Sequence, residues 1–121
     1  VERVPNSRIR ELMQPWDIVA DQFIMGWYAL FAIEGMSMGK PVMAYLRPDL
    51  VELYSLYSYA GSCPIVNSSP LRIKAALREL VLKPELRATL GSRGREYVQR
   101  HHSLEALGQT LESIYQRLWT S

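Results

Sequence analysis

The stretch Asp21–Val42, DQFIMGWYALFAIEGMSMGKPV, decides the fold that this sequence predicts. The apolar run Ile18–Ala20 precedes it and is too short for a helix, which indicates a buried strand. Helical spacing of apolar residues then predicts a helix over Ala29–Met38, with Gly39 at its C′ position. A second apolar strand, Val42–Leu46, follows at once. The result is a strand–loop–helix–strand unit whose loop lies at the carboxyl end of a strand, where open α/β sheets bind ligands.

The flanking segments extend this alternation. A helix is predicted before the unit, over Arg8–Gln14, and another after it, from Leu50 to about Tyr57. The segment Ser55–Ser62 mixes Ser, Tyr and Gly and supports no assignment. Pro64–Asn67 reads as a third short strand, followed by a compact helix cap, Asn67–Pro70.

From Leu71 onward the sequence predicts only helices. Their expected ranges are Leu71–Leu82, Glu85–Arg100 and a last helix capped by Ser103. Gly91 and Gly94 are expected to weaken the second of these helices. The predicted fold class is therefore α/β, a Rossmann-like parallel sheet with flanking helices that ends in a run of helices.

Composition limits the possible functions. The length of 121 residues is typical of one domain. Hydrophobic residues make up 48% of the chain and charged residues 21%, which is ordinary for a globular protein. A net charge of +2 is too small to indicate nucleic acid or an anionic membrane as partner. With one cysteine, Cys63, no internal disulfide forms, which fits a cytoplasmic location, including the inner face of the membrane. The chain opens without methionine at Val1, and we expect it to be a fragment of a longer protein.

Several segments, in this order and spacing, resemble the retaining glycosyltransferases of the GT-B class, specifically the large group-1 (GT4-like) family. The run EGMSMGKPV resembles that family's E-A-M-A-x-G-x-P-V signature for donor binding. The other matching segments are Asp17–Val19, Pro84–Leu86, Leu90–Arg95 and the pair His101-His102 with Ser103-Leu104. The resemblance covers nearly the whole chain and implies one partial domain, residues 1–121, the second half of a C-terminal donor-binding domain.

The resemblance also implies an activity. Such enzymes transfer a glycosyl group from a nucleoside-diphosphate sugar to an acceptor, in a cleft against an N-terminal acceptor-binding domain. The nucleotide sugar is a substrate, no cofactor is implied, and the absence of an Asp-x-Asp pair implies no metal. The isolated fragment is expected to bind weakly and to catalyse nothing. In this class the last helix packs on the N-terminal domain, so Leu118 and Trp119 are expected to face a partner and to promote self-association in isolation.

The candidate donor site follows from physical chemistry and from the resemblance together. Backbone N–H groups of Tyr28, Ala29 and Leu30, at the positive end of a helix, suit a diphosphate. The resemblance implies that the Glu34 carboxylate accepts hydrogen bonds from the ribose hydroxyls, and that Arg3 and Val4 lie near the base. No catalytic residue is assigned.

One position departs from the family. The family has two glutamates separated by seven residues, and the earlier one, which contacts the transferred sugar, corresponds to Gly26 in this chain. Asp21 is the hypothetical substitute for that carboxylate, and a simple loop cap is its equally plausible alternative. Glu34 has a similar alternative, exposure to water or pairing with Lys40. Trp27 and Tyr28 are expected either to pack on the sheet or to bind the ligand.

Other residues favour structural roles, and two other function classes remain open. The pair His101-His102 has no ligand partner at metal spacing and indicates a helix end. Cys63 is expected at the start of a strand. The first alternative function is a non-catalytic nucleotide-binding or scaffolding module, which the missing glutamate favours. The second is a sugar-nucleotide epimerase-like GT-B domain, because fold does not fix function.

Overall fold

The structure, a computed structural model, describes residues 4–57 and 60–120 and has a three-stranded parallel sheet at its centre. The strands are β1 (Val19–Ala20), β2 (Val42–Ala44) and β3 (Val66–Asn67), in the order β1-β2-β3. Val19 pairs with Val42, and Met43 pairs with Val66. All three residues of β2 are buried. A central parallel strand covered on both faces is expected to be apolar along its whole length, as Val42, Met43 and Ala44 are.

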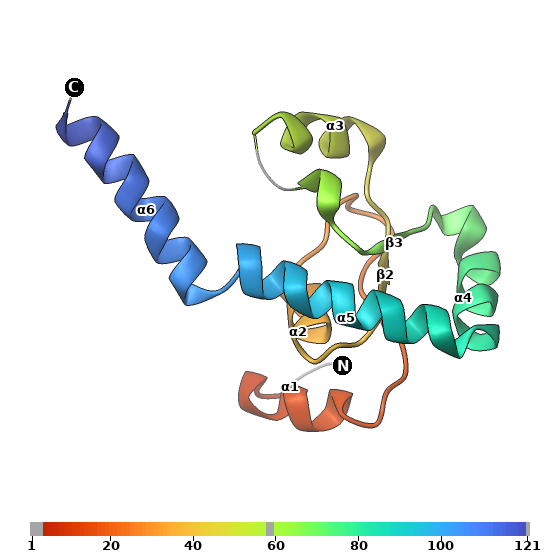
Figure 1. The fold of residues 1–121 in the computed structure, drawn as a ribbon. Helices are drawn as coiled ribbons and strands as arrows, with labels where there is room; N and C mark the ends of the chain where they lie inside the picture. Colours follow the sequence, from red (N-terminus) through yellow and green to blue (C-terminus); the bar gives the residue numbers. More distant parts are fainter. Residues whose placement is uncertain (1–3, 58–59, 121) are drawn as a thin grey trace.

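Helices connect and cover these strands (Figure 1). Before the sheet comes α1 (Asn6–Met13), whose Met13 is fully buried. The crossover from β1 to β2 is α2 (Leu30–Ser37), and β2 continues through α3 (Pro48–Tyr57) and the short 3₁₀ helix η1 (Ala60–Ser62) toward β3. The core between sheet and helices includes Val19, Ala32 and Met36. The predicted α/β unit is confirmed, with element ends shifted by a few residues.

The helix α5 (Pro84–His101) packs directly on α2, and glycines make this approach possible. A Cβ atom at Gly91 would overlap the backbone carbonyl of Gly39, and one at Gly94 would lie 3.1 Å from the Cγ of Met36. Both glycines are buried. Both glycines are expected to weaken α5. They also allow α5 to approach α2 and the turn at Gly39 closely.

The remaining C-terminal helices lie at the edges of the molecule. The 3₁₀ helix η2 (Pro70–Arg72) leads into α4 (Ile73–Leu82), where Leu80 is the buried residue. The predicted cap before it is only partly correct. Pro70 begins the helical segment, but Ser69 makes no capping bond through its side chain.

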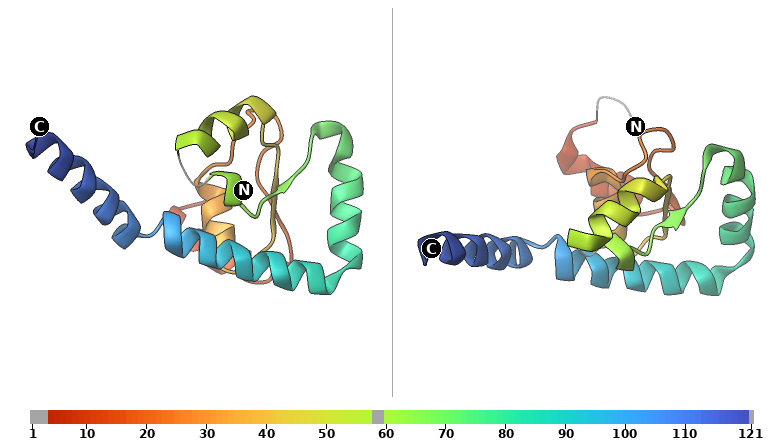
Figure 2. Two further views of the ribbon diagram at one scale, coloured as in Figure 1. Left: turned by 45° about the horizontal axis from the view of Figure 1, so that its top comes forward. Right: turned by 90° about the horizontal axis from the view of Figure 1, so that it is seen from above.

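The last helix, α6 (Leu104–Trp119), projects away from the rest of the molecule in every view (Figures 1 and 2). Its predicted cap is confirmed, since Ser103 Oγ accepts a hydrogen bond from the Ala106 N–H at 3.1 Å. No residue of α6 is buried, and Trp119 is 89% exposed. Its apolar residues recur at alternating spacings of three and four, at Leu104, Leu107, Leu111, Ile114 and Leu118.

Candidate functional site

The carboxyl ends of the three strands form one connected edge. Beyond β2, the Tyr45 N–H donates to the Gln22 carbonyl at 2.9 Å. The Asn67 side chain extends the sheet on the other side. Its Oδ1 accepts from the Leu46 N–H at 2.8 Å and its Nδ2 donates to the Leu46 carbonyl at 3.0 Å. These bonds fix the edge at which the loop between β1 and α2 begins.

The Gln22 side chain folds that loop. Its Oε1 accepts from the backbone N–H groups of Ile24, at 3.2 Å, and Met25, at 2.7 Å. Because the oxygen must face these two donors, the orientation of the amide is fixed by its hydrogen bonds. The Gln22 Nε2 is buried and has no hydrogen-bond partner within the described part of the chain. A buried donor of this kind favours a bound acceptor, such as water or a ligand oxygen.

The Asp21 carboxylate closes the loop at the beginning of α2. Its Oδ2 accepts a hydrogen bond from the Ala29 N–H at 2.9 Å. The N–H of Ala29, expected to be available for a diphosphate, is therefore engaged within the protein, and Asp21 acts as the loop cap. The N–H groups of Leu30 and Phe31, in the first turn of α2, have no carbonyl partner one turn earlier in the helix.

Glu34 lies in the second turn of α2 and is half-buried. The described residues form no ion pair with its carboxylate, and Lys40 Nζ instead donates to the Gln14 carbonyl at 2.8 Å. The alternative of a Glu34–Lys40 pair is therefore wrong. The carboxylate remains positioned on α2, one turn after the N-terminal N–H groups.

Gly26 has a left-handed backbone conformation, with φ of 85°, and is buried. A Cβ atom at this position would overlap the side chain of Arg47. The Arg47 N–H also donates to the Gly26 carbonyl at 2.9 Å. The position aligned with the family's first glutamate thus suits glycine, because a side chain would strain the backbone and would have to displace the side chain of Arg47.

Arg47 is the cation that sequence reasoning did not identify. Its guanidinium binds Asp49 through Nε at 3.1 Å and Nη2 at 2.6 Å, and the hydrogen bond lowers the pKa of the Asp49 carboxyl. Arg47 is exposed and lies against the loop that precedes α2. Its contact with Gly26 joins residues far apart in sequence, so no local motif signals it.

Tyr28 connects this loop to the end of α5. Its hydroxyl lies 3.0 Å from the Tyr97 hydroxyl and 3.1 Å from His102 Nε2. Trp27 stacks on Tyr28 with ring centroids 5.2 Å apart, and both rings pack against the core. The expectation that these aromatics pack on the sheet agrees with these contacts. His101 ends α5, as expected for a helix-end pair.

Burial shifts the pKa values of Tyr97 and His102 toward their neutral forms. It raises the pKa of Tyr97 far above its ordinary value, and the hydrogen bond with Tyr28 adds to the effect. It lowers the pKa of His102, and the neighbouring His101 lowers it further. Both residues therefore favour their neutral forms.

A pocket of about 420 Å³ borders Asp21. Two aromatic residues on its wall, Trp16 and Phe31, have ring centroids 6.3 Å apart. The other lining residues, Ile18 and Ala20, belong to the strand segment. Trp16 and Phe31 are further candidates for ligand contact at this pocket, and the sequence pattern did not identify them.

Three predicted site residues remain, two at the N-terminus of the chain and one at the beginning of α2. Val4 is half-buried, and Leu30 is 75% exposed at the beginning of α2. Arg3 lies outside the described residues. Within the described residues no cluster of three or more potential metal ligands is found, and no helix is long and apolar enough to cross a membrane.

Comparison with known proteins gives one informative similarity. The chain is 32% identical over 91 residues to a protein of Methanocaldococcus jannaschii named as an uncharacterized glycosyltransferase. The matched region is 75% of this chain but only 25% of that relative, so the chain spans about a quarter of the relative's length. No protein-family model matches the chain, and no solved structure matches it significantly. The chain is thus related to a protein that carries the name of a glycosyltransferase.

Proposed function

We propose that this chain is the nucleotide-sugar donor-binding part of a retaining GT-B glycosyltransferase of the group-1 (GT4-like) family. The parent enzyme transfers a glycosyl group from a nucleoside-diphosphate sugar to an acceptor bound by an N-terminal domain, and acts in the cytoplasm. The observation that carries the proposal is the position of the α2 N-terminus, which follows β1 at the carboxyl edge of a parallel sheet, with Glu34 one turn further along the helix. The similarity to a protein named as a glycosyltransferase supports it.

The diphosphate and the ribose of the donor each have a candidate partner on α2. The N–H groups of Leu30 and Phe31 and the positive end of α2 suit the diphosphate. The carboxylate of Glu34 suits two ribose hydroxyls. The buried Gln22 Nε2 group has no hydrogen-bond acceptor in the described part of the chain, and an oxygen atom of the nucleotide sugar would supply one.

The proposed contact with the transferred sugar differs from the family pattern, because Gly26 replaces the family's first glutamate. Gly26 leaves no room for a carboxylate, and Asp21, which caps α2 through Oδ2, retains a second oxygen for a sugar hydroxyl. Arg47 lies against the same loop with its guanidinium bound to Asp49, so positive charge for the leaving diphosphate comes mainly from the N-terminus of α2. Tyr28, Gly26 and Val4 contribute backbone rather than side-chain groups in this arrangement, whereas the Ala29 N–H is already engaged by Asp21.

A non-catalytic nucleotide-binding module is the second candidate, and the Gly26–Arg47 contact is the observation that favours it. Assaying sugar transfer and sugar epimerisation with the longer parent chain separates the possibilities. Transfer from a nucleoside-diphosphate sugar, lost in Glu34→Ala, supports the glycosyltransferase. Nucleotide binding without turnover supports the module, and interconversion of the sugar without transfer supports an epimerase.

A further inference from the structure

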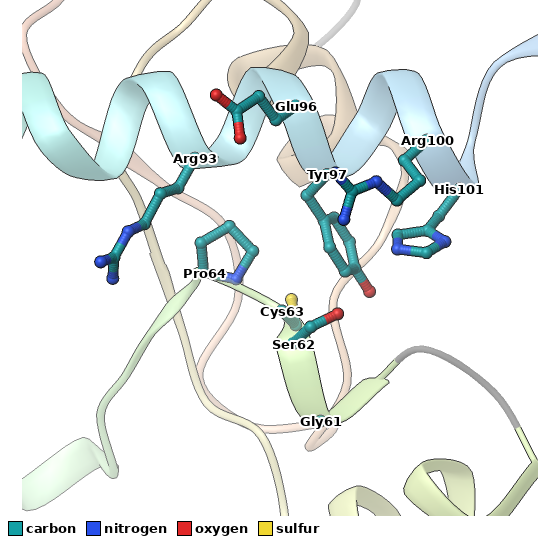
Figure 3. A pocket seen from close by; sticks show the side chains of 9 residues that line it. All are labelled: Gly61, Ser62, Cys63, Pro64, Arg93, Glu96, Tyr97, Arg100 and His101. Carbon is teal, nitrogen blue, oxygen red and sulfur yellow. The ribbon is translucent and has the colours of Figure 1, made fainter.

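A second pocket of about 420 Å³ lies between α5 and the segment that leads into β3 (Figure 3). The loop side consists of Gly61, Ser62, Cys63 and Pro64. The α5 side presents residues that include Tyr97, Arg100 and His101. None of the lining residues belongs to the predicted donor site, so the function proposed above does not use this pocket.

The helix side of the pocket is cationic. Arg93 and Arg100 are seven residues apart, which places them about two turns, or about 10.5 Å, apart along one face of α5. Neither guanidinium has an ion-pair partner within residues 4–57 and 60–120. Glu96 is the one carboxylate among the lining residues, and in Figure 3 its carboxylate stays at the level of the helix. The Arg100 guanidinium lies beside Tyr97, and the Arg93 guanidinium lies on the opposite side of Pro64 in that view.

The floor of the pocket is neutral. Pro64 and the ring of Tyr97 form an apolar surface, and the Ser62 hydroxyl lies near the Tyr97 hydroxyl in the view of Figure 3. Burial raises the pKa of the Cys63 thiol, which therefore stays protonated and brings no negative charge. A neutral floor beneath two guanidinium groups suits an oxyanion, because arginine donates to phosphate and carboxylate oxygens in a planar fork.

We propose that this pocket binds a small oxyanion ligand, a phosphate or a carboxylate, through Arg100 at the end of the pocket formed by Ser62 and Tyr97, with Arg93 adding positive charge from the other end. The ligand site is separate from the proposed site of the nucleotide donor. A bound oxyanion here contacts Tyr97, whose hydroxyl reaches the Tyr28 hydroxyl at 3.0 Å, so the pocket is connected to the loop before α2.

The test is a backbone amide NMR titration of the ¹⁵N-labelled chain at low ionic strength, which limits screening of the charges. Inorganic phosphate and succinate are the two probes. The proposal expects saturable shifts at the amides of Ser62, Cys63 and His101. It expects Arg100→Ala to weaken binding about tenfold, the loss of one charge-assisted hydrogen bond. Arg95→Ala, an exposed arginine of α5 outside the pocket, is the matched control and is expected to bind as the native chain does.

Each outcome is decisive. Shifts with phosphate alone assign a phosphate ligand, and shifts with succinate assign a carboxylate. No saturable shift with either probe overturns the proposal, as does equal binding by Arg100→Ala and Arg95→Ala. Because the donor site would bind phosphate through Leu30 and Phe31, phosphate shifts at Ser62, Cys63 and His101 without shifts at Leu30 and Phe31 separate this pocket from the donor site.

Discussion

The carboxylate of Asp21 accepts a hydrogen bond from the backbone N–H of Ala29, with Oδ2 2.9 Å from the nitrogen. This bond spans eight residues and closes the loop between β1 and α2. It also places a negative charge at the end of a helix whose dipole attracts anions. The Asp21 side chain therefore contributes to the local stability of the candidate donor site, together with Gln22.

Asp21→Ala is expected to lower the free energy of unfolding by about 1 kcal/mol, the typical cost of a lost helix cap. Asp21→Asn keeps an acceptor oxygen and is expected to lose less than half of that amount. Urea unfolding followed by tryptophan fluorescence measures both. If the two variants were equally stable, the bond to Ala29 would contribute nothing.

Gly26 cannot be changed to the family's glutamate without cost. Its φ of 85° and the contact with Arg47 both oppose a side chain. We expect Gly26→Glu to destabilise the fold by on the order of 2–4 kcal/mol, from backbone strain and overpacking. In the double variant Gly26→Glu/Arg47→Ala, we expect the stability lost to overpacking to return and the stability lost to backbone strain to stay lost.

Gly108→Ala is the matched control, because a Cβ at Gly108 meets no atom within 4 Å. In the exposed interior of α6 it is expected to leave stability unchanged or to raise it by up to about 1 kcal/mol. A Gly26→Glu variant as stable as Gly108→Ala would contradict the role given to Gly26.

Gly91→Ala tests the contact between α5 and α2. The new methyl group would overlap the Gly39 carbonyl, and backbone atoms cannot rotate aside as a flexible side chain can. Overpacking of this kind costs about 1–3 kcal/mol. Thermal unfolding of Gly91→Ala beside Gly108→Ala measures it, and an unchanged melting temperature for Gly91→Ala would show that the helices separate at no cost.

Stability is expected to fall as the pH falls below about 6.5, the ordinary pKa of histidine. Burial lowers the pKa of His101 and His102 in the folded chain, so the unfolded chain binds protons more readily in this range. The urea midpoint should decrease between pH 7.5 and 5.5. The double variant His101→Gln/His102→Gln should show a flatter dependence, and an identical slope would exclude these histidines as its cause.

The terminal helix is expected to bind a partner through its exposed apolar residues, the N-terminal domain in the parent enzyme and a second copy in the isolated chain. The alternating spacing of three and four from Leu104 to Leu118 is that of a helix-pairing seam. Sedimentation equilibrium should show concentration-dependent dimers that Leu111→Glu abolishes. A monomer with its tryptophans shielded from solvent would contradict this expectation.

The sequence predicted the elements well because their signals are local. Ser103 caps α6 as expected, and the Gly39–Pro41 segment ends α2 before β2. The missed features depend on contacts between distant residues. Tyr28 and Tyr97 are 69 residues apart, and Gly91 shows its packing role only where it meets Gly39. The chemistry of Arg47 was missed for the same reason, since its partner across the loop is Gly26.

The measurement that tests the central claim most directly is ligand-detected NMR of the chain with UDP, GDP and ADP. The experiment is repeated on Glu34→Ala and on Glu105→Ala, an exposed glutamate of α6 that serves as control. The proposed donor site predicts binding of one nucleotide, lost in Glu34→Ala and retained in Glu105→Ala. Binding that is unaffected by Glu34→Ala, or no binding to any of the three nucleotides, would contradict a donor site at the N-terminus of α2.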